Sequence, residues 1–244
     1  MSKKIHIGTS GWSYNHWKGS FYPEKTSGNR MLPFYANHFS TVEINATFYR
    51  LPSIKTLEKW YRAVPEDFVF SVKASQYITH RKKLNDPKES IKKFFDHIPS
   101  LKNKLGPILF QLPPNWHKNI LRLADFNAAL PDNYRYVFEF RDPDWFADDI
   151  VDLLNENNIA FCIYDLEGNE IPLHITADFA YVRLHGPGPK YQGNYSKELL
   201  EKWADRFQEW MEEDLEIYCY FNNDYGGHAP KNATLLEEIM RVPS

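Results

Sequence analysis

The sequence predicts an α/β fold, namely a TIM-type (β/α)8 barrel that forms a single domain over residues 1–244. Three observations support this prediction. Short β-rich runs alternate with helical patterns, the length matches the about 250 residues of a complete barrel, and polar side chains recur where the β-rich runs end. Strand–helix alternation of this length is typical of a parallel sheet.

The β-rich runs are predicted to be strands. Eight such strands are predicted, near residues 5–8, 41–45, 68–74, 107–112, 135–141, 159–165, 179–185 and 216–222. An open doubly wound sheet is the alternative architecture. It is disfavoured because Gly8, Gly11 and Gly19 lack the G-x-G-x-x-G spacing of a dinucleotide-binding loop.

Helical patterns separate most of these runs. Apolar residues recur at three- and four-residue steps over 30–39, 54–64, 87–98, 119–130, 146–157 and 196–211. Pro87 and Ser196 stand where helices are expected to begin. Segment 165–178 contains Gly168 and Pro172 without a helical period, so we expect the sixth helix to be reduced or missing. A short last helix is predicted at 232–240, with Asn232 as its cap.

Polar side chains at the strand ends are the main functional signal. Along the strands they alternate with apolar residues, which should pack under the helices, so the polar phase should point into the barrel. The strand-end residues are Glu43, Asn45, Lys73, Gln111, Glu139, Arg141, Asp165, Arg183, His185, Asn222, Asn223 and Asp224. Of these, we expect Glu43, Lys73, Gln111, Glu139, Arg141, Arg183, His185 and Asn222 to converge on the mouth of the barrel, with Asp165 nearby. A balanced salt-bridge network is the alternative interpretation, but buried ion pairs are a weak source of stability. We therefore predict a ligand pocket.

Each residue type suggests a role in that pocket. Arg141 and Arg183 are expected to hold an anion, and Lys73 to stabilise developing negative charge or act as a nucleophile, including through a Schiff base. Proton exchange is assigned to Glu43 or Glu139 with His185. The predicted catalytic residues are Glu43, Lys73, Glu139 and His185. The predicted substrate-binding residues are Trp12, Tyr14, Asn45, Gln111, Arg141, Asp165, Arg183, Asn222, Asn223 and Asp224.

Three loops extend the prediction. The loop at 9–25 is rich in aromatic residues, of which Trp12 and Tyr14 are expected to line the pocket and Phe21 and Tyr22 to pack. The loops after the seventh and eighth strands are rich in glycine and are candidates for phosphate binding, completed by Arg183 and Lys190. The isolated loop histidines His80 and His228 are interpreted as incidental.

No cofactor is predicted, and the known metal motifs are absent from the sequence. A divalent metal held by Glu43, Glu139, Asp165 and His185 is a lesser alternative, because the interleaved cations would repel it. The two cysteines, Cys162 and Cys219, lie in apolar runs and are expected to be reduced and buried.

Composition bears on the partners and on the location of the protein. The net charge of −3 disfavours extended nucleic-acid binding. The chain has no apolar signal region and no run near the ~18 apolar residues of a membrane span, so we expect a soluble cytoplasmic protein. The oligomeric state is left open.

The chain resembles the YecE-like family, a domain of unknown function numbered seventy-two. The resemblance spans nearly the whole sequence and rests on the blocks I-G-T-S-G-W-S-Y, V-E-I-N-A-T-F-Y-R-L-P, F-S-V-K-A, I-T-H, G-P-I-L-F-Q-L-P-P, F-E-F-R-D-P-D-W, Y-V-R-L-H-G and Y-F-N-N-D-Y-G-G-H-A-P-K-N-A. It implies a TIM-type barrel of uncharacterised activity, without an assigned substrate, cofactor or catalytic residue.

Function is therefore predicted from the strand ends alone. The first hypothesis is an enzyme that acts on a small anionic substrate, such as a phosphorylated sugar, by acid/base chemistry. One alternative is a glycoside hydrolase that uses Glu43 and Glu139. A second alternative is a module that binds nucleic-acid ends or nucleotides and is not an enzyme.

Overall fold

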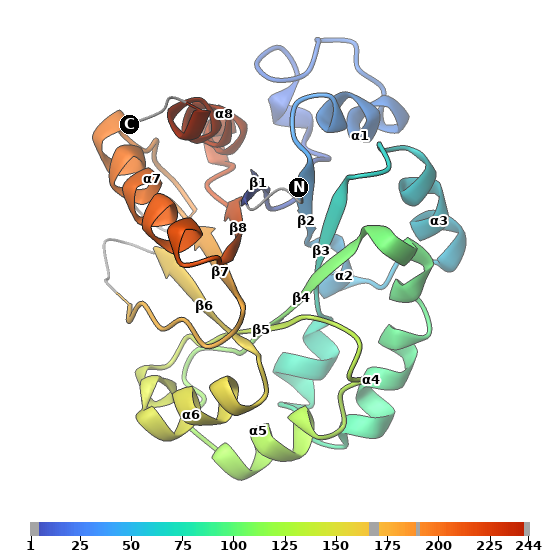
Figure 1. Ribbon diagram of the computed structural model, residues 1–244. Coiled ribbons are helices and arrows are strands. Elements are labelled where there is room, and N and C mark those ends of the chain that lie inside the picture. The colour runs from blue at the N-terminus through green and yellow to red at the C-terminus, as the bar shows by residue number, and fades with distance from the viewer. Residues whose placement is uncertain (1–4, 166–170, 189–190, 242–244) are drawn as a thin grey trace. The chain divides into compact units, whose positions relative to one another are not determined.

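The computed structural model describes residues 5–165, 171–188 and 191–241, and within them the predicted parallel fold is present (Figure 1). The strands form one eight-stranded sheet in the order β1-β8-β7-β6-β5-β4-β3-β2, which is the topology of a TIM-type (β/α)8 barrel. Their bounds are β1 Ile5–Thr9, β2 Thr41–Ile44, β3 Val69–Lys73, β4 Leu105–Gln111, β5 Tyr136–Glu139, β6 Ala160–Asp165, β7 Phe179–Leu184 and β8 Glu216–Phe221. The predicted fold class is confirmed.

The helices follow the predicted alternation. The α-helices are α1 Gly28–Ala36, α2 Ala46–Tyr49, α3 Ile54–Arg62, α4 Pro87–Phe95, α5 Ile120–Asn127, α6 Asp148–Glu156, α7 Lys197–Glu212 and α8 His228–Arg241. The shorter helical turns are η1 Asn15–Trp17, η2 Tyr77–Arg81, η3 Ile98–Lys104, η4 Pro143–Phe146 and η5 Tyr225–Gly227.

Two predicted helix starts are confirmed and one is wrong. Pro87 is the first residue of α4, and Ser196 caps α7 by accepting the backbone N–H of Leu199. Asn232 does not cap the last helix, because α8 begins at His228 and Asn232 is buried inside it. Within the described part of the connection between β6 and β7, residues 171–178 contain no helix, as predicted. Gly168 lies outside the described residues.

The chain comprises two compact units. The first contains residues up to Glu43, Ile163–Leu173 and the chain from Phe179 onwards. In it β8 lies between β1 and β7 in parallel register, and α8 packs against α7, β1 and β8. Figure 1 shows α7 and α8, in orange and dark red, side by side.

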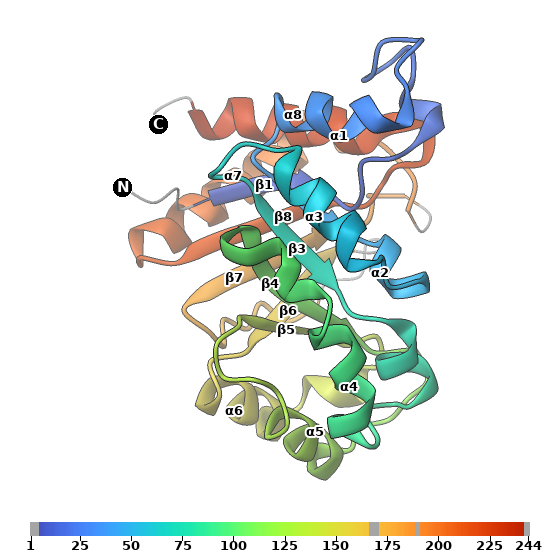
Figure 2. The ribbon, with the colours of Figure 1, turned by 90° about the vertical axis from the view of Figure 1, so that its right-hand side faces the viewer.

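The second unit contains Ile44–Cys162 and His174–Asp178. Here β4 pairs with both β3 and β5, with Gln111 directly beside Glu139. Helix α3 packs on η3. Helix α5 lies against α6, as Figure 2 also shows. Its core is aromatic, since Phe110 stacks on Phe138 and both contact Phe126 edge-on.

Other sequence expectations are also met. Cys162 and Cys219 are both free and buried, and burial raises the pKa of the Cys219 thiol. Among the helices of the described residues, none combines the length and apolar character needed to cross a bilayer.

Candidate functional site

The Glu43 carboxylate is the centre of a buried network in the first unit. It accepts hydrogen bonds from Ser10 Oγ at 2.7 Å, from Tyr181 Oη at 2.7 Å, and from Nε and Nη2 of Arg183 at 2.9 and 2.7 Å. Glu43 and Arg183 are fully buried. A carboxylate offers about four lone-pair positions, so these four donors fill them. This geometry favours a role in holding β1, β2 and β7 together over a role in proton transfer.

His185 and Asn222 meet at the ends of β7 and β8. Asn222 Nδ2 donates to His185 Nδ1 at 3.1 Å, so a neutral His185 ring carries its proton on Nε2. The backbone N–H of His185 donates to the carbonyl of Asp165 at 3.0 Å. Burial raises the pKa of the Asp165 carboxyl, although a hydrogen bond from Tyr195 opposes the shift. Three of the predicted residues are thus brought together.

Asn223 and Asp224 follow β8 but have different surroundings. Asn223 is buried, and its Nδ2 donates to the carbonyl of Gly193 and to Oδ1 of Asn232, each at 2.9 Å. Asp224 instead borders a cavity of about 560 Å³, together with His16, Tyr191, Gln192, Tyr225 and Gly226. Burial raises the pKa of its carboxyl. This cavity lies in the loops after β7 and β8, where phosphate binding was predicted; Lys190 lies outside the described residues.

In the second unit, Lys73 and His80 contact the same aromatic ring. Lys73 is the last residue of β3, and its Nζ lies over the Phe48 ring, 4.2 Å from the centroid. The His80 ring meets Phe48 edge-on, with centroids 5.0 Å apart. The Thr47 hydroxyl ties α2 to this strand end through the carbonyls of Ile44 and Lys73. Phe48 is therefore a shared support for an ammonium and an imidazole group.

The environment of His80 suits proton transfer. Its pKa is lowered from 6.5, first because the ring is about half buried and second because Lys73 is positively charged, while Glu139 acts in the opposite direction. Nδ1 lies 2.9 Å from Thr79 Oγ1, whose hydroxyl donates to the carbonyl of Ser75. When the hydroxyl does so, Nδ1 carries the proton and the lone pair is on Nε2.

Glu139 and Arg141 form an ion pair at the end of β5, through Nε and Nη2 of the guanidinium. Both side chains are buried, with exposed fractions of 0% for Glu139 and 6% for Arg141. Gln111 is the neighbour of Glu139 in the sheet, and the Cys162 thiol is directed at its second oxygen at 4.0 Å. Asn45, at the start of α2, has a buried Oδ1 without a hydrogen-bond partner among the described residues.

The aromatic loop is packed in the first unit. Trp12 is buried, its carbonyl accepts the Tyr22 hydroxyl, and Tyr14 donates to the carbonyl of Ser10. Tyr22 is also buried, and Phe21 contacts Phe34 edge-on, so the predicted packing of Phe21 and Tyr22 is confirmed. Trp12 and Tyr14 do not border the cavity beside Asp224, and their assignment to a ligand pocket stays a prediction.

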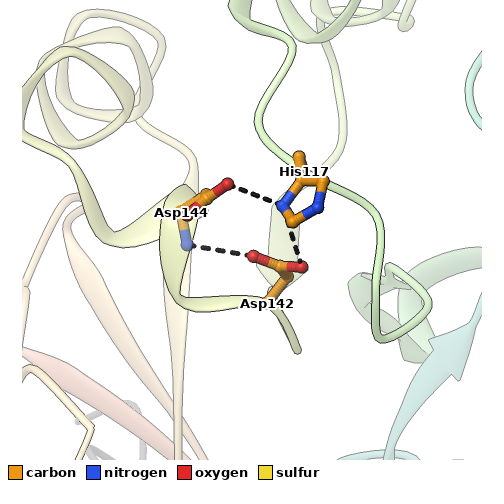
Figure 3. Close-up of side chains that lie close together, drawn as sticks. All are labelled: His117, Asp142 and Asp144. Carbon is orange, nitrogen blue, oxygen red and sulfur yellow. Dashed lines mark hydrogen bonds and ion pairs between the residues drawn. The ribbon is translucent and has the colours of Figure 1, made fainter.

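Among the described residues, one set of side chains has the spacing of metal ligands: His117, Asp142 and Asp144 (Figure 3). His117 Nδ1 lies 2.7 Å from Asp144 Oδ2 and 3.5 Å from Asp142 Oδ2. The loop of His117 is held against η4 by a hydrogen bond from Trp145 Nε1 to the carbonyl of Trp116. This cluster was not predicted from the sequence, where the pattern D-P-D at 142–144 is its only local signal.

Two residues emphasised by the structure were undervalued or unassigned from the sequence. His80 was interpreted as incidental, because no neighbouring motif marks that it shares the Phe48 ring with Lys73. Phe48 was assigned no role, although it lies three residues after the end of V-E-I-N. Asn45 and Phe48 are three residues apart, and this helical spacing was the available sequence signal that the two lie close together.

A (β/α)8 topology with charged and amide side chains at the ends of its strands defines this protein as a TIM-type barrel protein. Within that class the chain belongs to the family described as "Protein of unknown function DUF72", whose sequence model matches residues 6–243. The resemblance predicted from the sequence blocks is confirmed. The family description assigns no activity or ligand.

Named relatives agree with this membership. The UPF0759 protein YunF of Bacillus subtilis (strain 168) is 27% identical, over 98% of this chain and 95% of its own length. The UPF0759 protein YecE of Escherichia coli (strain K12) is 24% identical, over 97% and 93%. A crystal structure of a DUF72 family protein from Thermotoga maritima MSB8 has a TM-score of 0.86 at 28% identity, and covers 98% of this chain and 100% of that one.

Proposed function

We propose that this protein is an enzyme that acts on a small anionic substrate by acid/base chemistry, at the carboxyl ends of β3, β4 and β5. The observation that carries the proposal is the pairing of Lys73 and His80 on Phe48. Lys73 carries a positive charge, and His80 has a ring nitrogen that can take up a proton near neutral pH. Strand ends are where TIM-type barrels place their chemistry.

Cationic groups at two of the three strand ends support an anionic substrate. Lys73 ends β3, and Arg141 follows β5 with its guanidinium oriented by Glu139. An oriented guanidinium binds carboxylate or phosphate oxygens in a fixed geometry. The buried Oδ1 of Asn45 adds an acceptor to which a substrate hydroxyl or amine can donate. The proposed substrate thus combines an anionic group with a donor group.

His80 is the proposed proton-transfer group. When the Thr79 hydroxyl donates to the carbonyl of Ser75, Nδ1 carries the proton and Nε2 carries the lone pair, and the lowered pKa keeps that lone pair available at neutral pH. Lys73 then stabilises the negative charge that develops when a proton is removed. Glu43, one of the residues to which proton exchange was assigned from the sequence, is less suited to this role, because four donors fill its lone-pair positions.

The backbone around His80 supports the same conclusion. Residues 77–81 form a single π-helical turn, and Lys83, Leu84 and Asp86 follow with left-handed φ values of 47°, 63° and 47°. Such turns and left-handed non-glycine residues are costly, and they concentrate at functional sites. The strain is local to the loop that carries His80.

Ligand-induced stabilisation tests the anionic part of the proposal. Purified protein is melted with sugar phosphates, nucleotides and carboxylates, where a ligand at a hundred times its dissociation constant stabilises by about 2.7 kcal/mol. We expect one anionic class to raise the melting temperature. Lys73→Met should abolish the rise, whereas Lys83→Met, which removes a nearby charge from the same loop, should retain it. An equal rise in wild type and Lys73→Met would contradict the proposal.

A further inference from the structure

We infer that the cavity beside Asp224 is a separate binding site for a neutral polyhydroxylated ring, that is, a saccharide. The cavity belongs entirely to the first unit and holds about 560 Å³, within the range of roughly 300–1,000 Å³ of small-molecule sites. The inference does not depend on the proposed acid/base site. Because the inference concerns binding alone, it can be tested by binding measurements even though no reaction is known.

Hydrogen bonds connect the loops that form the cavity. The loop that follows β7 is called the β7 loop. Asn223 donates to the carbonyl of Gly193 in this loop and to Oδ1 of Asn232 in α8. Asn232 donates in turn to Asn194 Oδ1 at 2.9 Å. Gly186 has a φ of +110°, and a Cβ there would lie 2.0 Å from the carbonyl oxygen of Gln192. The β7 loop therefore folds back tightly on itself. These contacts anchor Gly193 and Asn194, which follow Tyr191 and Gln192 in the chain.

The polar groups of the cavity are matched to hydroxyls. His16 Nε2 donates to the backbone carbonyl of Asp224 at 2.8 Å and lies 3.7 Å from its Oδ2. Nε2 must therefore carry a proton. The Asp224 carboxylate accepts hydrogen bonds, and the Gln192 amide both donates and accepts. Pairs of adjacent hydroxyls on a sugar ring offer the complementary donors and acceptors.

Aromatic rings supply the apolar contact. Tyr225 borders the cavity with 69% of its surface exposed, and Tyr191 is held edge-on to His185 with centroids 5.3 Å apart. Flat rings stack on the C–H face of a sugar. An exposed tyrosine beside a carboxylate and an amide is a recognisable saccharide-binding combination.

Charge separates a saccharide from other ligands. The Asp224 carboxylate borders the cavity and would repel phosphate. A cation is disfavoured because His16 already lies beside that carboxylate and because burial disfavours its charged form. A neutral ligand avoids both the repulsion expected for phosphate and the reasons that disfavour a cation.

Saturation-transfer NMR tests the inference with D-glucose, D-galactose, D-mannose and D-ribose as probes, alongside glucose 6-phosphate and choline. We expect at least one neutral sugar to bind. Asp224→Asn should weaken binding by about 10- to 100-fold, because a charge-assisted hydrogen bond is lost. Tyr225→Ala should weaken it by about two- to tenfold, through loss of stacking. The matched control Tyr49→Ala removes a tyrosine that is 75% exposed in the second unit and should have no effect.

Three results would overturn the inference. The first is the absence of binding by every neutral sugar at millimolar concentration. The second is sugar binding of equal strength in wild type, Asp224→Asn and Tyr225→Ala, with melting curves confirming that both variants are folded. The third is choline or glucose 6-phosphate binding that depends on Asp224 while glucose itself does not bind.

Discussion

At the residue scale, Glu43 and Arg183 show how a pair of charged side chains at strand ends can have a structural role, here in holding β2 and β7 together. Neither side chain is exposed, and the two are joined by two hydrogen bonds. Burial raises the pKa of Tyr181, and the neighbouring negative charge of Glu43 adds to the shift, so this hydroxyl remains a donor to Glu43. The network contributes mainly by avoiding an unpaired buried charge.

We expect Glu43→Gln to destabilise the fold by about 3–5 kcal/mol, because Arg183 is left as an uncompensated buried charge. Tyr181→Phe, which removes one neutral donor, should cost only about 1 kcal/mol. Denaturant unfolding measures both. A loss below about 1 kcal/mol for Glu43→Gln would show that the pair is not a structural element.

The lowered pKa of His80 gives a pH dependence at the same scale. Because the pKa in the folded protein lies below 6.5, the unfolded chain takes up this proton first as the pH falls. Stability therefore decreases below about pH 6.5, and this loss ends below the folded pKa. In His80→Gln the decrease should be smaller.

NMR titration of the His80 ring measures the shift directly. The midpoint should lie below 6.5 in the wild type, where the ring is partly buried, and should rise in Lys73→Met when the neighbouring positive charge is removed. Lys83→Met serves as the control and should leave the midpoint unchanged. A midpoint at or above 6.5 in the wild type would contradict the assigned environment.

At the element scale, loop geometry depends on contacts between residues that lie far apart in the sequence. Pro87 and Ser196 could be assigned from the sequence because a first-turn proline and a capping serine act within one helical turn. Asn232 was misassigned because its amide bonds to Asn194 and Asn223, which no local pattern predicts. Caps are local, whereas buried amide networks are not.

Glycine substitutions test the tight fold of the β7 loop. Gly186→Ala should destabilise by about 1–3 kcal/mol, since it combines a left-handed φ with a clash against the Gln192 carbonyl. Gly28→Ala is the matched control, because Gly28 begins α1 and a Cβ there meets nothing within 4 Å. It should be neutral or stabilise by up to about 1 kcal/mol. Equal unfolding free energies for the two variants would contradict the loop geometry.

At the scale of the whole molecule, the parallel topology was predictable and the pairing of the strand ends was not. Period-two patterns and helical spacing identify the elements and the end at which polar groups gather. They do not show that Arg183 bonds Glu43, 140 positions away, or that His117 lies beside Asp144, 27 positions away. They also gave no reason to connect His80 with Lys73, because the two side chains meet on the Phe48 ring and His80 lies in the π-helical turn of η2.

The net charge of −3 gives a prediction for the whole chain. Extended nucleic-acid binding rests on many phosphate contacts and loses affinity steeply with salt. We expect no retention on a DNA column at physiological ionic strength, and only a shallow salt dependence for any small anion that binds. Retention with a steep salt slope would instead favour the nucleotide-binding alternative.

Turnover by wild type and His80→Gln tests the central claim most directly. An anionic ligand that stabilises the protein is incubated with each, and its conversion is followed by NMR. We expect the wild type to convert the ligand, and His80→Gln to bind it but to convert it about 10²- to 10⁴-fold more slowly. Conversion at an equal rate by His80→Gln, or no conversion by the wild type, would contradict the assignment of this site as an acid/base catalyst.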